Sequence, residues 1–187
     1  MSMTPDEIWE RMDQYATAFG RLSMAWSNLE YNMAALTERL LGTTKQNADI
    51  VYYSMNPVAR KDLISALAKQ NLDEALQAKI AAFLAEYDRI RVRRNDIIHS
   101  PVAWLDPADG IMRQRITKQR GVLRETVVEA PLKQVEQLAR EANGLAHAVL
   151  GEITYHADFE AAFIAIKTAA TTPEAPTSDT SGGVAAS

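Results

Sequence analysis

The sequence contains no cysteine among its 187 residues. Disulfide bonds, a thiolate nucleophile and cysteine-based metal sites are therefore excluded, and a reducing, cytoplasmic location is expected. Long uncharged apolar runs are missing as well: no stretch of about 18 such residues occurs, and the first 28 residues lack the pattern of a secretory signal. We expect a soluble protein with no membrane partner.

Familiar enzyme motifs are also missing. The sequence has no phosphate-binding P-loop, no dinucleotide fingerprint, no His-Glu-x-x-His metal motif and no nucleophile elbow. Only 3 histidines occur, and two of them, His147 and His156, have no metal-ligand partner at a useful spacing. No metal and no cofactor are expected.

The sequence does have enough apolar material for one domain. Hydrophobic residues make up 47% of the chain, which suits a single core at this length. We predict one helical domain over residues 1–167. Residues 168–187 are small and polar and include two prolines, so we predict that they form a disordered tail.

Basic residues are concentrated in one part of an otherwise acidic chain. The formal net charge is -4, yet residues 89–124 hold nine Lys and Arg residues against three Asp and Glu residues. A local excess of positive charge of this kind favours contact with a polyanion such as RNA. The candidate RNA-binding residues are Arg89, Arg91, Arg93, Arg113, Arg115, Lys118 and Arg120.

Most of the chain has the apolar spacing of helices. From Ile8 to Leu40, apolar residues alternate spacings of four and three, which predicts a long helix that ends at Gly42. Further helices are expected at about 47–55, from the capping residue Asn56 to about Gln70, from Asp73 to about His99, and from Pro131 to about Lys167.

Residues between the last two of these helices alternate instead. Segments 102–105, 111–118 and 122–129 predict a small antiparallel β-ribbon. The predicted fold is therefore mainly α: a bundle of four to five helices, with a ribbon at about residues 102–129 inserted before the last long helix.

The helix expected from Asp73 carries an arginine on its apolar stripe. Arg94 occupies a position whose other members are apolar or aromatic, so it is expected to face inward. A guanidinium there needs a carboxylate, carbonyl groups or a bound anion, because an unpaired buried charge costs several kcal/mol. Ser100 precedes Pro101, which ends the helix near His99 and places that histidine beside Arg94.

Residues 94–99 read R-N-D-I-I-H. An Arg-Asn pair followed by His at a helix end resembles the signature of the HEPN superfamily (higher eukaryotes and prokaryotes nucleotide-binding). Residues 25–30, A-W-S-N-L-E, are similar to the first helix of its bacterial members. The resemblance covers residues 5–167. It implies a helical bundle and metal-independent RNA cleavage by 2′-OH attack, an activity of many HEPN proteins including toxins and defence nucleases.

The resemblance also implies roles for three residues, with Glu30 in support. His99 would move a proton, Arg94 would hold the phosphate through its planar guanidinium, and Asn95 would orient the histidine or the substrate. Because a single histidine serves two proton transfers poorly, the dimeric arrangement of the family predicts a homodimer with His99 of both subunits in one basic cleft. RNA is the expected substrate, and an antitoxin or another protein is an alternative partner.

A second interpretation needs no catalysis. Arg94 is then a structural arginine paired with Glu30, Asn95 hydrogen-bonds at a helix end, and His99 is a helix-terminal histidine. The chain would be a non-catalytic HEPN-like module that binds RNA, a nucleotide or a protein partner. A third interpretation, a purely structural dimer, predicts no salt-dependent binding of RNA.

Overall fold

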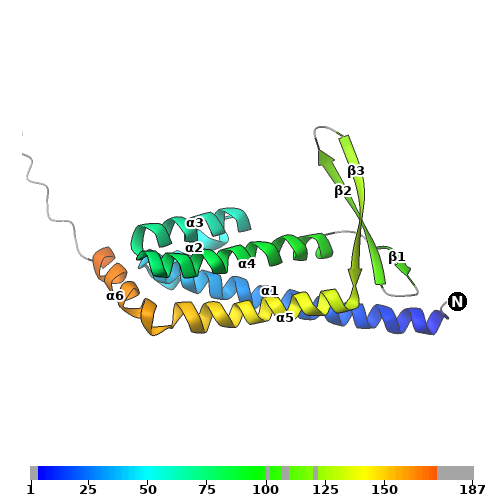
Figure 1. Ribbon diagram of the computed structural model, residues 1–187, viewed down its shortest axis with the longest axis horizontal. Coiled ribbons are helices and arrows are strands. Elements are labelled where there is room, and N and C mark those ends of the chain that lie inside the picture. Colours follow the sequence, from blue (N-terminus) through cyan, green and yellow to red (C-terminus); the bar gives the residue numbers. More distant parts are fainter. Residues whose placement is uncertain (1–3, 100–101, 107–109, 120–121, 172–187) are drawn as a thin grey trace, which may run out of the picture.

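The helical bundle predicted from the sequence is confirmed (Figure 1). The computed structural model describes the backbone of residues 4–99, 102–106, 110–119 and 122–171, and the side chains of residues 4–99 and 130–171. The elements in chain order are α1 (Pro5–Leu41), α2 (Lys45–Tyr53), α3 (Pro57–Asn71), α4 (Glu74–Ile98), β1 (Val102–Asp106), β2 (Gly110–Gln119), β3 (Val122–Pro131), α5 (Leu132–Ala148), the π-helix η1 (Val149–Thr154) and α6 (Ala157–Thr171).

Capping groups set the ends of the first four helices. Thr4, Thr44, Asn56 and Asp73 each accept a hydrogen bond from a backbone N–H in the first turn of the helix that follows. α1 ends at Gly42, whose φ of 61° lies in the left-handed region that glycine adopts without strain. The helix ends predicted at Gly42, Asn56 and Asp73 are therefore confirmed.

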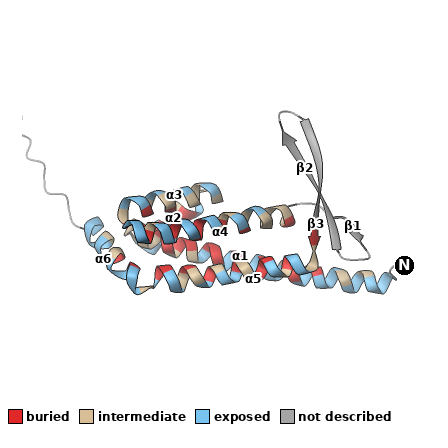
Figure 2. Cartoon of the chain, viewed as in Figure 1, coloured by how far each residue is buried: buried red, intermediate tan, exposed pale blue. Residues whose placement is uncertain are grey.

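α1 supplies much of the core. α1 and α5 lie side by side and run in the same direction, whereas α4 runs the opposite way and packs against α3 and α5 (Figure 1). Leu22, Leu29, Leu36 and Leu40 of α1 are fully buried in the core that these helices share. Figure 2 shows buried residues along α1, α4 and α5, with exposed residues between them.

The first turns of α1 differ from the prediction. The expected apolar stripe includes Ile8 and Met12, but Met12 is exposed and Ile8 is only half-buried. This end of α1 extends beyond the end of α4 and the start of α5 (Figure 1), so it has fewer helical neighbours. The stripe enters the core only at Tyr15.

The single helix predicted from Pro131 to about Lys167 is wrong. α5 ends at Ala148, η1 follows, and α6 turns away from the axis of α5 (Figure 1). The His156 Nδ1 atom accepts a hydrogen bond from the Asp158 backbone N–H at 3.2 Å and so starts a new helix. Apolar spacing continues across the break because both helices face one core. The described residues therefore form six α-helices rather than four to five.

Between α4 and α5 the described backbone forms three strands. They pair in the order β1-β2-β3, antiparallel, at the end of the bundle where α4 stops and α5 begins (Figure 1). At the other end of the domain, α6 continues to Thr171, so the first four residues of the predicted tail are helical. The rest of that tail, 172–187, lies outside the described residues.

Two glycines of α1 and its cap give a direct test of the packing. A Cβ at Gly42 would meet the backbone oxygen of Ile166 at 3.0 Å, and the positive φ of this position would strain any L-residue. A Cβ at Gly20 would meet nothing within 4 Å. Gly42→Ala is expected to lower the free energy of unfolding by about 1–2 kcal/mol or more, and Gly20→Ala to raise it by about 0.5–1 kcal/mol. Urea denaturation measures both, and equal effects of the two substitutions would contradict the predicted contact.

Candidate functional site

The last turn of α4 brings three predicted site residues together. The backbone N–H of His99 donates to the Asn95 carbonyl at 3.0 Å, which closes the turn and leaves the His99 side chain exposed at the helix tip. Arg94 lies on the inward stripe between Ile90 and Ile97, both fully buried. The spacing predicted this inward position, and the structure shows Arg94 as half-buried.

Arg94 points its guanidinium at the other two residues of the motif. Its Nη1 donates to Asn95 Oδ1 at 3.1 Å and lies 3.5 Å from His99 Nε2. Because a guanidinium only donates hydrogen bonds, this long contact is a hydrogen bond only if Nε2 carries a lone pair. A neutral imidazole with its proton on Nδ1 satisfies this requirement, and its Nε2 atom is then able to accept a proton.

The rest of the guanidinium lies over an aromatic ring. Arg94 Cζ is 5.7 Å from the centroid of the Trp26 ring on α1. The Arg94 Nε atom is buried and has no hydrogen-bond acceptor among the described residues. Arg94 is thus held by its own helix and by an indole face, while its Nε–H group stays unpaired within the described part of the chain.

The alternative pairing of Arg94 with Glu30 is wrong. The Glu30 carboxylate binds a different cation: Oε2 lies 2.5 Å from Arg60 Nη1 of α3. The hydroxyl groups of Tyr52 and Tyr87 donate to the two carboxylate oxygens at 2.9 and 2.6 Å. Glu30 therefore supports the site only through the core and does not touch the motif.

The two tyrosines that donate to Glu30 have strongly raised pKa values. Burial, and then the negative charge of Glu30, raises the pKa of Tyr52 and of Tyr87 well above the ordinary value. Both hydroxyl groups consequently remain protonated and act as donors to Glu30 across the physiological range. The cluster is a closed, fully occupied set of donors around one carboxylate.

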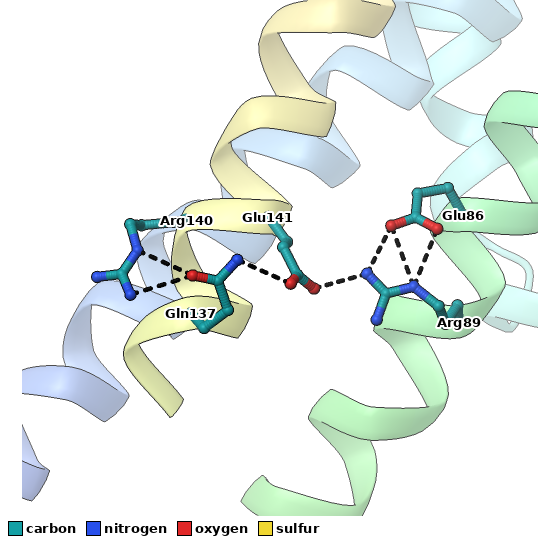
Figure 3. A network of polar contacts seen from close by, with 5 residues as sticks. All are labelled: Glu86, Arg89, Gln137, Arg140 and Glu141. Carbon is teal, nitrogen blue, oxygen red and sulfur yellow. Dashed lines mark hydrogen bonds and ion pairs between the residues drawn. The ribbon is translucent and has the colours of Figure 1, made fainter. Parts of the chain in front are cut away.

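Two of the candidate RNA-binding arginines are engaged by acidic residues. Arg89 lies between Glu86 of α4 and Glu141 of α5, with its Nη2 atom 2.5 and 2.6 Å from their oxygens (Figure 3). Arg91 contacts Asp88 of its own helix at 2.9 Å. Carboxylates of the protein thus already neutralise the charge of both guanidinium groups.

The remaining basic candidates are divided between α4 and the strands. Arg93 of α4 donates to the Gln134 side chain of α5. Arg113, Arg115 and Lys118 belong to β2, but their side chains lie outside the described residues, as does Arg120 altogether. The RNA-binding role of all these residues stays a prediction.

Sequence reasoning missed the partners that hold the motif in place. Trp26 entered the sequence analysis only within the stretch 25–30, and Tyr52, Tyr87 and Arg60 were not singled out. Trp26 and Arg94 each lie on the apolar stripe of a helix, which was a usable signal. Pairing them requires the relative register of α1 and α4, and no spacing within one helix contains that information.

Comparisons of the chain with protein-family models, with curated proteins and with solved structures found no match. The HEPN resemblance therefore stays a prediction that rests on residues 25–30 and 94–99. Within the described part of the chain, no cluster of three or more His, Asp or Glu side chains is placed to hold a metal ion. No helix in this part is both long and apolar enough to cross a membrane.

The Glu30 cluster gives the first prediction for this region. Glu30→Gln keeps the size of the side chain but removes the charge that compensates Arg60, and breaking a buried ion pair in this way costs about 3 kcal/mol or more. Urea denaturation is expected to show this loss, whereas Glu10→Gln, at an exposed position of α1, should change stability by less than about 0.5 kcal/mol. Equal stability of the two variants would refute the proposed importance of the buried pair.

The Arg89 network predicts a dependence of stability on pH. Hydrogen bonds from Arg89 lower the pKa of Glu86 and of Glu141. Because these folded-state values lie below the unfolded ones, the stabilisation is present above the ordinary glutamate pKa of about 4.3 and is lost as pH falls through the folded values. Arg89→Gln should therefore destabilise the protein at pH 7, by no more than about 1 kcal/mol per exposed pair, and less at low pH.

Unfolding by urea between pH 3 and pH 7 measures this difference. Arg21→Gln, at an exposed position of α1, serves as the control for loss of a positive charge elsewhere. Parallel stability curves for the wild type and Arg89→Gln across this range would show that the network does not contribute.

Proposed function

We propose that the chain is an endoribonuclease that cleaves RNA without a metal ion, as its resemblance to HEPN proteins implies. The observation that carries this proposal is the 3.5 Å separation of Arg94 Nη1 and His99 Nε2 at the tip of α4. It supports a site in which one residue holds a phosphate and its neighbour moves a proton.

The chemistry begins with the ribose 2′-OH. His99 Nε2 takes the proton of this hydroxyl while the 2′-oxygen attacks the adjacent phosphorus. Arg94 neutralises the charge that builds on the phosphoryl oxygens, and the bond to the 5′-oxygen breaks. A phosphate oxygen that binds Arg94 Nη1 replaces its long contact with His99 and frees the Nε2 lone pair. Asn95 holds the guanidinium in place during this exchange.

The leaving 5′-oxygen needs a proton from a second group. One chain has one histidine at this site, so we propose a homodimer in which His99 of another copy, in its protonated form, supplies that proton. The products are a 2′,3′-cyclic phosphate and a free 5′-OH. The two imidazoles end with exchanged protonation states and return to the starting state through solvent.

RNA affinity is proposed to come from the basic window at residues 89–124. Arg93, Arg113, Arg115, Lys118 and Arg120 are its proposed contacts, and Arg89 and Arg91 contribute by exchanging carboxylates for phosphates. The same resemblance extends the proposal to a toxin or defence nuclease, with an antitoxin as the protein partner.

One observation favours a second candidate function. The guanidinium of Arg94 already has Asn95, His99 and the Trp26 ring as neighbours, an arrangement that also suits an arginine retained for packing. The chain would then be a non-catalytic HEPN-like module that binds RNA, a nucleotide or a protein partner. Such a module binds without cleaving.

An RNA cleavage assay in EDTA separates the two functions. The wild-type protein is expected to cut single-stranded RNA and leave 2′,3′-cyclic phosphate ends, because attack comes from the 2′-OH. His99→Ala is expected to reduce the rate by about 100-fold to 10,000-fold, the usual contribution of a positioned acid–base group. Product ends are identified by mass spectrometry, and rates come from gel-resolved time courses.

The matched control is His147→Ala, which removes an exposed histidine of α5 and should leave the rate unchanged. An oligonucleotide with 2′-deoxyribose at every position should bind without being cut. Unchanged cleavage by His99→Ala, or cleavage of the deoxy oligonucleotide, would overturn the proposal. Full activity of a protein that sediments as a monomer would exclude the two-histidine arrangement.

A further inference from the structure

Trp26 connects the candidate site to the core of the bundle. Its side chain belongs to α1 and is only 9% exposed, and Arg94 Cζ of α4 lies 5.7 Å from the centroid of its ring. A guanidinium within about 6 Å of an indole face is attracted by the negative charge of that face. Because Arg94 Nε is buried, little water competes with this attraction.

The indole is itself held from the core. The Tyr87 ring stacks on Trp26 with centroids 5.2 Å apart and planes at 27°. The Tyr87 hydroxyl donates to Glu30 Oε1 at 2.6 Å, and Glu30 Oε2 lies 2.5 Å from Arg60 Nη1. The orientation of the indole is thereby set by a tyrosine that the buried carboxylate fixes in place.

The Arg94 guanidinium has contacts within its own helical end and one contact with a second helix. Asn95 and His99 belong to the same helical end as Arg94, and their contacts are 3.1 and 3.5 Å long. Trp26 belongs to another helix and supports the face of the guanidinium. An arginine side chain has several rotatable bonds and loses substantial rotamer entropy when it is ordered, so a rigid surface from a second helix limits the conformations that it adopts.

We propose that Trp26 is a positioning residue for Arg94: the indole holds the guanidinium in the conformation that places Nη1 beside His99. Trp26 does not touch substrate in this arrangement, because its side chain is buried. The consequence for RNA cleavage rests on the function proposed for Arg94 and His99, whereas the effect on the ordering of Arg94 does not.

Side-chain NMR tests the ordering of Arg94 without reference to activity. The heteronuclear NOE of the Arg94 Nε–H group reports how rigid the guanidinium is. In Trp26→Leu this NOE is expected to fall to the value of an exposed arginine such as Arg21, whereas that of Arg89, which two carboxylates hold, should not change. Trp26→Phe keeps an aromatic face and should give an intermediate value, and it carries the test if the leucine variant does not fold.

The control for a general loss of core packing is Phe83→Leu. Phe83 is a buried aromatic residue of α4, three turns before Arg94. Its substitution should lower stability while leaving the NOE of Arg94 unchanged. An Arg94 NOE that is the same in Trp26→Leu and in the wild type, or that falls equally in Phe83→Leu, would overturn the positioning role.

A double-mutant cycle tests the consequence for cleavage. Trp26→Leu is expected to lower kcat by about 10-fold to 100-fold, the range expected when a catalytic group is misplaced. In an Arg94→Lys background, which has no planar guanidinium to position, the same substitution should have almost no further effect. Independent, multiplicative effects on the rate would overturn the proposal, as would an unchanged rate in Trp26→Leu.

The two proposals fail in different ways. If the wild-type protein does not cleave RNA but the Arg94 NOE falls in Trp26→Leu, the ribonuclease function fails and the positioning of Arg94 by Trp26 stands. If the wild type cleaves RNA while Trp26→Leu changes neither the NOE nor the rate, the function stands and the positioning role is refuted.

Discussion

The carboxylate of Glu30 joins four helices at one buried point. Glu30 belongs to α1, and its two oxygens accept hydrogen bonds from Tyr52 of α2, Arg60 of α3 and Tyr87 of α4. A carboxylate at this depth is tolerated only when a cation and several donors replace the water that it loses. Since those donors come from three different helices, a single charged group relates α2, α3 and α4 to α1.

The candidate site contacts this cluster indirectly, through Trp26 and Tyr87. Tyr87 is both a donor to Glu30 and the ring against which Trp26 stacks, and Trp26 in turn lies under Arg94. The exposed tip of α4 that carries His99 therefore rests on a continuous set of packed groups that leads to the core. An arginine–histidine pair held by two helices and a buried carboxylate keeps its geometry better than one held by a loop.

Some features of this site were predictable because they lie within one helix. The inward position of Arg94 follows from the spacing of apolar residues along α4, and its nearness to His99 follows from a helix that ends at that residue. The helix ends at Gly42, Asn56 and Asp73 were predictable for the same reason, because a cap acts on the backbone of its own turn. Apolar spacing did not reveal the break after Ala148, because α5 and α6 bury their apolar residues in the same core.

Local sequence thus set where the first four helices begin and end, and placed an arginine and a histidine together at the tip of α4. The choice of partners was made by packing. Arg60 of α3 rather than Arg94 pairs with Glu30, and Trp26 rather than a carboxylate supports Arg94. Both contacts depend on the register of α3 and α4 against α1. That register minimises the energy of the whole core at once, so it is a property of all the helices together and of no segment alone.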